Sequence, residues 1–122
     1  MPRVVHFEIT ANNPEKVTAF YQKVFDWQMQ KWDGPIEYWL VTTGPDSVPG
    51  INGGIFKPKE NYSATINTIE VDNLEKYIER VKANNGQIVV EKTAIPGIGY
   101  YVYAKDIEGT LFGIMQSDPS AK

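Results

Sequence analysis

The spacing of hydrophobic positions changes from alternating to helical and back to alternating twice along the chain. Residues 4–10 alternate between apolar and polar side chains, which predicts a β-strand. Asn13 and Pro14 follow, a favoured N-cap residue and a favoured first helical residue. Four apolar side chains then recur at helical spacing: Val17, Phe20, Tyr21 and Val24. Further strands are predicted at residues 27–32, 37–43 and 51–56.

The same order begins again after a polar stretch. Residues 64–71 predict a strand, and Asn73 predicts the N-cap of a second helix. The apolar face of this helix consists of Leu74, Tyr77, Ile78 and Val81, and Asn84–Gly86 predicts its end. Three more strands are predicted at residues 87–93, 99–105 and 110–116. Residues 117–122 are expected to form a frayed tail.

Identical residues sixty positions apart support a duplication. The pairs are Ile9 and Ile69, Asn13 and Asn73, Glu15 and Glu75, Lys16 and Lys76, Asp46 and Asp106, and Gly53 and Gly113. Several of them fall where a backbone needs a particular residue, such as a cap or a turn, which is typical of a repeated structural unit. We divide the single domain of residues 1–122 into module one (residues 3–57), a linker (58–63) and module two (64–117).

Two modules of one strand, one helix and three strands predict an α+β fold. Each βαβββ module alone can bury only one face of its sheet against its helix. Two modules in tandem are expected to form a curled mixed sheet around a cavity, with the helices outside. A domain of 122 residues is long enough to bury a substantial core without cross-links.

Composition and charge exclude several classes of function. The chain has no cysteine, which excludes disulfides and thiolate chemistry and is typical of a reducing compartment. Its net charge of −3, with scattered Lys and Arg, argues against nucleic-acid binding. No apolar run reaches the length of a membrane span, and the N-terminus does not resemble a signal peptide. We expect a cytoplasmic protein with no nucleic-acid or membrane partner.

Several short motifs follow one another in an order typical of a known family. They are His6–Ile9, Phe20–Tyr21, Val24–Trp27, Val71–Leu74, Gly86, Pro96–Gly99 and Asp106–Gly113. In this order the chain resembles the vicinal oxygen chelate superfamily, which holds glyoxalase I (lactoylglutathione lyase), the bleomycin-resistance proteins and the extradiol dioxygenases. Asp26 departs from the family's usual glycine, and Ile107 departs from the proline of its D-P-x-G turn. The resemblance implies the glyoxalase/bleomycin-resistance fold and a homodimer.

The metal site of this family takes one ligand from the first strand and one from the last strand of each module. The sixty-residue offset assigns these positions to two pairs, His6 with Ile66 and Gly53 with Gly113. Isoleucine and glycine side chains cannot coordinate a divalent ion, and His6 is the only histidine. We therefore predict no metal ligand and no cofactor.

Glu8 and Glu70 are the remaining candidates for substitute metal ligands. They lie two and four residues beyond the first-strand positions, on the same strand face. We favour the interpretation that they are hydrogen-bonded or solvated carboxylates at the rim of the cavity. A divalent metal would bind here only through these substitutes.

The candidate site residues are one imidazole, two carboxylates and a set of tyrosines. His6 and Glu8 are the candidates for proton transfer. The candidate ligand-binding residues, chosen for apolar area combined with polar groups, are His6, Glu70, Tyr38, Tyr101 and Tyr103. The structural alternatives are that His6 is a remnant of an ancestral metal site and that the tyrosines pack in the core. Gly53 and Gly54 predict either a close backbone approach or a bulge in their strand.

Two functions from different classes are compatible with these residues. The first is binding of a small organic molecule in the cavity without a metal, as implied by the resemblance to bleomycin-resistance proteins. The second is a metal-dependent lyase or isomerase related to glyoxalase I, using His6 and Glu8, with or without Glu70 and residues of a second subunit. A third interpretation, an interaction module, would require an exposed apolar patch.

Overall fold

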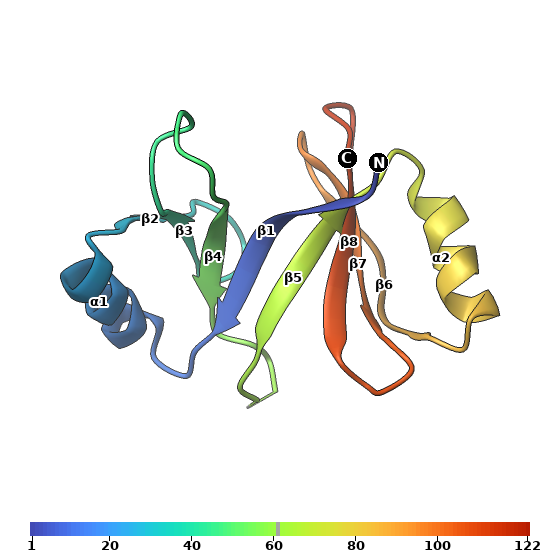
Figure 1. Cartoon of the computed structure of the whole chain (residues 1–122), viewed down its shortest axis with the longest axis horizontal. Coiled ribbons are helices and arrows are strands. Elements are labelled where there is room, and N and C mark those ends of the chain that lie inside the picture. Colours follow the sequence, from blue (N-terminus) through green and yellow to red (C-terminus); the bar gives the residue numbers. More distant parts are fainter. Residues whose placement is uncertain (61) are drawn as a thin grey trace. The chain divides into compact units, whose positions relative to one another are not determined.

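The chain folds into two βαβββ modules, as seen in a computed structural model that describes residues 1–60 and 62–122 (Figure 1). Module one contains β1 (Arg3–Thr10), α1 (Pro14–Phe25), β2 (Gln28–Lys31), β3 (Tyr38–Thr42) and β4 (Asn52–Phe56). Module two contains β5 (Thr65–Glu70), α2 (Leu74–Ala83), β6 (Gln87–Ile95), β7 (Gly99–Lys105) and β8 (Leu111–Ser117). Every predicted element is present, with its ends within two residues of the prediction. The predicted linker at 58–63 includes residue 61, which lies outside the described residues.

Both modules have the same strand topology. In module one the order is β2-β3-β4-β1, with β1 parallel to β4 and the other neighbours antiparallel. In module two the order is β5-β8-β7-β6, with β5 parallel to β8 and the other neighbours antiparallel. The chain separates into two compact units, residues 6–65 in one and residues 66–122 together with 1–5 in the other. The predicted α+β fold of tandem modules is confirmed.

Helix α1 covers one face of the module-one sheet. Asn13 caps it by accepting a hydrogen bond from the Lys16 backbone N–H at 3.2 Å. The helix ends at Asp26, whose φ of 61° is left-handed. Glycine would adopt this conformation without strain, whereas an aspartate is less favoured in it. Beneath the helix, a buried cluster consists of Ala11, Val41 and Ile55, with Phe7, Ile9, Val17, Tyr21, Trp27, Met29 and Trp39 packed against it.

The buried face of α1 differs from the sequence prediction. Phe20 and Val24 are 57% and 52% exposed, whereas Pro14 and Thr18 are buried. The face of α1 that packs on the sheet therefore includes Pro14 and Thr18, whereas Phe20 and Val24 lie outside it. The stacking of Tyr21 on Trp27, with ring centroids 5.0 Å apart and planes 6° apart, accompanies this packing.

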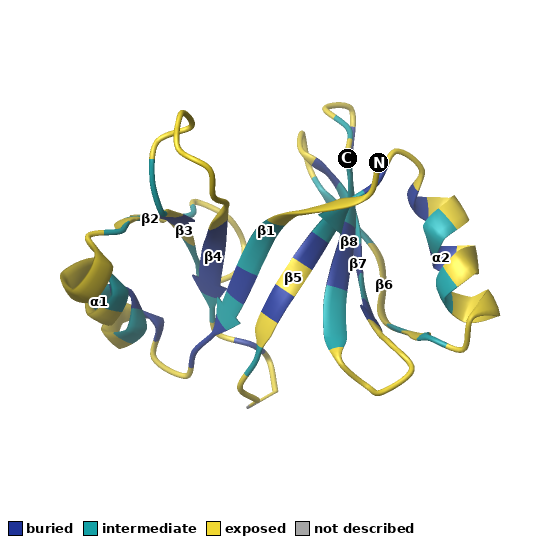
Figure 2. Ribbon diagram, in the orientation of Figure 1, coloured by how far each residue is buried: buried dark blue, intermediate teal, exposed yellow. Residues whose placement is uncertain are grey.

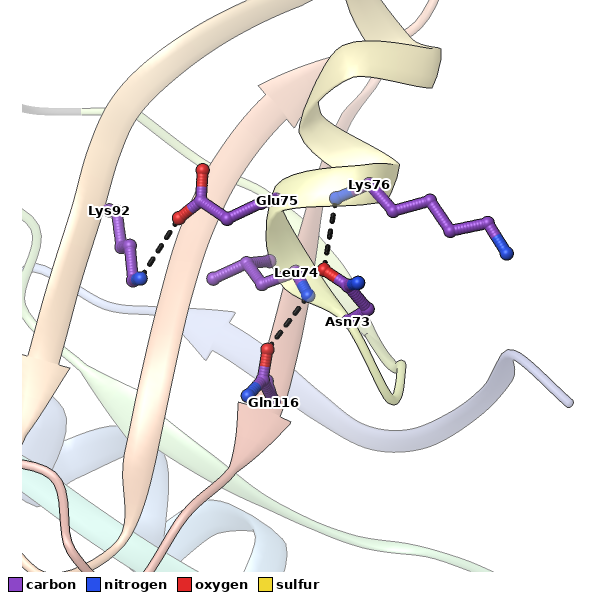
Figure 3. A network of polar contacts seen from close by, with 6 residues as sticks. All are labelled: Asn73, Leu74, Glu75, Lys76, Lys92 and Gln116. Carbon is purple, nitrogen blue, oxygen red and sulfur yellow. Dashed lines mark hydrogen bonds and ion pairs between the residues drawn. The ribbon is translucent and has the colours of Figure 1, made fainter.

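Helix α2 covers one face of the module-two sheet and is held by polar contacts at its N-terminus (Figure 3). Asn73 accepts a hydrogen bond from the Lys76 backbone N–H at 3.2 Å, and the Leu74 N–H donates to Oε1 of Gln116 at 2.8 Å. These acceptors satisfy N–H groups that have no partner inside the helix. The core beneath consists of Val71, Leu74, Ile78, Val102 and Ile114. Burial alternates along the first residues of β5, as expected for one covered face (Figure 2).

The C-terminal residues were predicted as a frayed tail, and this prediction is wrong. Ala121 is only 4% exposed. Its carbonyl accepts a hydrogen bond from the Gly97 N–H at 2.9 Å, and the Asp118 N–H donates to the Ile98 carbonyl at 2.8 Å. The tail therefore folds back on the turn between β6 and β7. Among the described residues, no helix is both long and apolar enough to span a membrane.

Candidate functional site

The candidate site lies on the face of the module-one sheet that is turned away from α1. Side chains alternate between the two faces of a strand. Phe7 and Ile9 of β1 pack in the core under α1, so His6 and Glu8 point to the opposite face. The same alternation places Tyr38 of β3 there, because its neighbour Trp39 is in the core. We call this surface, which carries His6, Glu8, Tyr38, Leu40 and Gly54, the site face.

A chain of hydrogen bonds links three residues of the site face. The Tyr38 hydroxyl donates to Oε2 of Glu8 at 2.7 Å, and Nε2 of His6 lies 2.8 Å from the same hydroxyl oxygen. The single proton of the hydroxyl is directed to Glu8, so its oxygen accepts from His6. Nε2 of His6 then carries the imidazole proton, and Nδ1 is a hydrogen-bond acceptor. Glu8 is 7% exposed, and its charge-assisted bond with Tyr38 offsets part of the cost of burial.

Two adjacent glycines of β4 make room for this arrangement from opposite sides of the sheet. A Cβ on Gly54 would overlap the Tyr38 ring and hydroxyl, whereas a Cβ on Gly53 would meet the ring of Phe7 under α1. The close approach that the glycine pair predicted is therefore present at both residues. The ring of Tyr38 stacks on Phe56 with centroids 5.9 Å apart, and it meets Trp32 edge to face at 6.1 Å. Tyr38 is thus held by aromatic contacts as well as by hydrogen bonds.

Burial and charge shift two pKa values around the site face. Desolvation lowers the pKa of His6 from 6.5, and the negative charge of Glu8 opposes this shift only in part. Desolvation raises the pKa of Tyr62, and the carboxylates of Glu8 and Glu60 raise it further. The carbonyl of Tyr62 accepts a hydrogen bond from Oγ1 of Thr10 at 3.0 Å. Sequence reasoning missed Tyr62, because no pattern marks a residue of a connecting segment as a neighbour of Glu8.

The remaining predicted ligand-binding residues belong to module two. Oε2 of Glu70 accepts a hydrogen bond from the Ser117 hydroxyl at 2.7 Å. Tyr101 and Tyr103 contact one another edge to face, with centroids 5.5 Å apart. Tyr103 lies opposite Gly113 in the ladder between β7 and β8. Of the predicted site residues, His6, Tyr38 and Glu8 are therefore connected by hydrogen bonds. Tyr101 and Tyr103 contact each other, and Glu70 is hydrogen-bonded to Ser117.

The strand register corrects the predicted equivalence of the last strands. Glu8 lies opposite Gly54 in the β1–β4 ladder, while Thr68, sixty residues further on, lies opposite Gly113. Gly54, not Gly53, is therefore the structural counterpart of Gly113. The offset between the modules is therefore one residue shorter at the last strands than at the first strands. Gly54 has no metal-binding side chain either, so the predicted lack of ligands at this position is unchanged.

The described residues also limit the set of metal donors. In residues 1–60 and 62–122, no group of three or more His, Asp or Glu side chains is placed to hold a metal ion. His6 and Glu8, the two nearest candidates, both bind the Tyr38 hydroxyl. These two residues alone supply fewer ligands than the four usual for a tetrahedral site or the three protein ligands usual for a catalytic zinc site.

One family model matches the chain, and several solved structures share its fold. The model of the Glyoxalase/Bleomycin resistance protein/Dioxygenase superfamily matches residues 3–114. A hypothetical protein from Bacillus halodurans C-125 has the same fold with a TM-score of 0.74 at 13% identity, covering 99% of this chain and 98% of that one. Methylmalonyl-CoA epimerase from Mycobacterium tuberculosis has a TM-score of 0.71 at 11% identity, covering 94% and 87% of the two chains.

A superfamily member from Vibrio splendidus 12B01 is similar as well. Its TM-score is 0.69 at 17% identity, and the match covers 96% of this chain and 100% of that one. No curated protein matches in sequence. At these identities the structural likeness shows the fold alone.

Proposed function

Because the chain belongs to the Glyoxalase/Bleomycin resistance protein/Dioxygenase superfamily, we propose that it binds a small organic molecule on the site face, without the metal site of the family. The observation that carries this proposal is the hydrogen-bonded chain from His6 through Tyr38 to Glu8. Burying a carboxylate and an imidazole costs free energy unless both are hydrogen-bonded. Titratable groups in such surroundings are concentrated at functional sites.

The direction of the hydrogen bonds supports a ligand that itself donates a hydrogen bond. Nδ1 of His6 is an acceptor, because Nε2–H is directed to Tyr38. The lowered pKa keeps the imidazole neutral near neutral pH. The aromatic contacts of Tyr38 with Phe56 and Trp32 add apolar surface on which a planar group can pack. The proposed ligand is therefore a planar or amphipathic molecule with an O–H or N–H donor.

A thermal-shift screen of small organic molecules tests the proposal. A ligand at about a hundred times its Kd stabilises the folded state by about 2.7 kcal/mol, which raises the Tm measurably. Tyr38→Phe keeps the ring but removes both hydrogen bonds of the chain, so it should reduce the Tm increase caused by each hit. The matched control is Tyr21→Phe, which changes a ring of α1 under the other face of the same sheet. The proposal is contradicted if no compound raises the Tm, or if the hits raise the Tm of Tyr38→Phe as much as that of the wild type.

A metal-dependent lyase or isomerase is the second candidate. It is favoured by one observation, the position of His6 and Glu8 on one strand face with a shared partner. A divalent ion there would polarise a substrate oxygen while a carboxylate moved a proton. Elemental analysis of protein purified without chelator, followed by calorimetric titration with Ni²⁺, Zn²⁺ and Mn²⁺, decides between the two candidates. Stoichiometric metal that is lost in His6→Gln would favour the enzyme, and sub-stoichiometric metal without binding heat would exclude it.

A further inference from the structure

A pocket lies between α2 and the sheet face of module two that α2 covers, with Pro2 from the N-terminal residues at its edge. It has a volume of about 250 Å³. Its apolar wall comes from the strands and their ends, and its mouth from the helix: Ile69, Val71, Phe112 and Ile114, with Tyr77 and Arg80. These residues share no element with the site face, so the pocket is a separate feature of the molecule.

The wall of this pocket suits an apolar group of modest size. Val71 and Ile114 are only 6% and 4% exposed, and Ile69 and Phe112 pack against the same core cluster. An apolar cavity of about 150 Å³ is already large enough to bind benzene, whereas pockets for drug-sized ligands begin at about 300 Å³. A short alkyl chain or a single aryl group therefore matches the space.

One positively charged residue, Arg80, lines the pocket with apolar atoms and holds its guanidinium over the neighbouring Tyr77 ring. Arg80 is the only charged residue among those that line the pocket. Its guanidinium carbon lies 5.1 Å from the centroid of the Tyr77 ring, and Nζ of Lys76 lies 5.7 Å from the same ring. Arg80 takes part in no ion pair within the described part of the chain. A guanidinium held over an aromatic ring keeps its planar set of donors available for a carboxylate.

From this combination we propose that the pocket binds a small amphipathic carboxylate. The apolar tail lies among Ile69, Val71 and Phe112, and the carboxylate accepts hydrogen bonds from Arg80, with Lys76 adding positive charge. The planar guanidinium can bind both oxygens of a carboxylate at once. An acidic head group is favoured over a neutral one because Arg80, the one charged residue that lines the pocket, is cationic.

Backbone-amide NMR shifts during titration with octanoate test this proposal on the whole chain. Shifts should appear at Ile69, Phe112 and the residues of α2, while the amides of Glu8 and Gly54 stay unchanged. Octan-1-ol serves as the uncharged probe of equal chain length. The proposal is overturned if saturating octanoate leaves the amides of Ile69, Phe112 and α2 unmoved, or if only the site face responds.

Two helix variants then separate charge recognition from unspecific adsorption. Arg80→Gln should weaken octanoate binding by about tenfold, the effect of losing a charge-assisted hydrogen bond. It should leave octan-1-ol binding unchanged. The matched control Lys82→Gln removes the same charge from the same turn of α2 at a residue that does not line the pocket, and it should change octanoate affinity by less than about twofold. Equal effects of the two variants refute a specific role of Arg80. The site-face proposal is unaffected by either outcome.

Discussion

Replacing Gly54 by alanine should dismantle the hydrogen-bonded chain without touching any of its members. The added Cβ would overlap the ring and the hydroxyl of Tyr38, so the Tyr38 side chain must move. A displaced Tyr38 loses its bond to the carboxylate of Glu8 and its bond to His6. A hydrogen bond to a charged group contributes about 1.5–3 kcal/mol and a neutral one about 0.5–1.5 kcal/mol. We therefore expect Gly54→Ala to lower the free energy of unfolding by about 2–4 kcal/mol.

Urea denaturation followed by fluorescence measures this change. Gly44→Ala is the matched control, because a Cβ there meets nothing within 4 Å and no left-handed φ is involved. It should shift the free energy of unfolding by less than about 0.5 kcal/mol. Tyr38→Phe and the double variant with Gly54→Ala complete a thermodynamic cycle. Because the same hydrogen bonds can be lost only once, the double variant should cost less than the two single variants together.

Two results would refute this reasoning. The first is a Gly54→Ala protein as stable as Gly44→Ala, which would mean that the Tyr38 ring does not occupy the space above Gly54. The second is full additivity of Gly54→Ala and Tyr38→Phe, which would mean that the glycine acts through something other than the hydroxyl. Either result would remove the structural basis of the site face.

Three further predictions concern other parts of the molecule. The pKa of His6 is lowered from 6.5 in the folded state. The stability that neutral His6 contributes should therefore be complete above pH 6.5 and decline as the pH falls from 6.5 toward the lowered pKa. Urea denaturation at several pH values should show this decline in the wild type and not in His6→Gln. Gln116→Ala removes the acceptor of the Leu74 N–H and should lower the free energy of unfolding by about 1–2 kcal/mol. Gln116→Glu keeps an acceptor and should lower it less. Equal decreases for the two variants, measured by calorimetry, would contradict this. Removing residues 120–122 exposes the surface beneath Ala121 and leaves the Gly97 N–H without its acceptor. The free energy of unfolding should therefore fall by about 1 kcal/mol, which lowers the Tm by several degrees. An unchanged Tm would show that the tail is not packed.

The elements of the fold were predictable because their signals are local. Asn13 and Asn73 each cap a helix through the residue three positions on, which is a signature readable within four residues of sequence. Strand alternation and the restart of the pattern after the linker located the remaining elements. The tandem order then followed from the repeat.

The contacts of the site could not be predicted, because they depend on register between distant strands. Tyr38 meets His6 and Glu8 across separations of 32 and 30 residues. A slip of one residue turns a side chain to the other face, and the choice of Gly53 over Gly54 was such a slip. Only the observed ladders show that Gly54 lies opposite Glu8.

Two other errors have a common cause. Apolarity alone placed Phe20 and Val24 of α1 toward the core, but the sheet beneath receives Pro14 and Thr18. The small residue Ala121 gave no hydrophobic signal, yet it is buried through backbone hydrogen bonds. In both cases the packing partner decided the outcome, and a single segment of sequence does not contain its partner.

Amide-shift mapping of the hits from the thermal-shift screen tests the proposed binding site most directly. If the site face binds the ligand, the largest shifts should fall on Glu8, Leu40 and Gly54, and they should weaken in Tyr38→Phe. Hits that leave these three amides unmoved while shifting others would contradict the assignment of function to the His6–Tyr38–Glu8 chain.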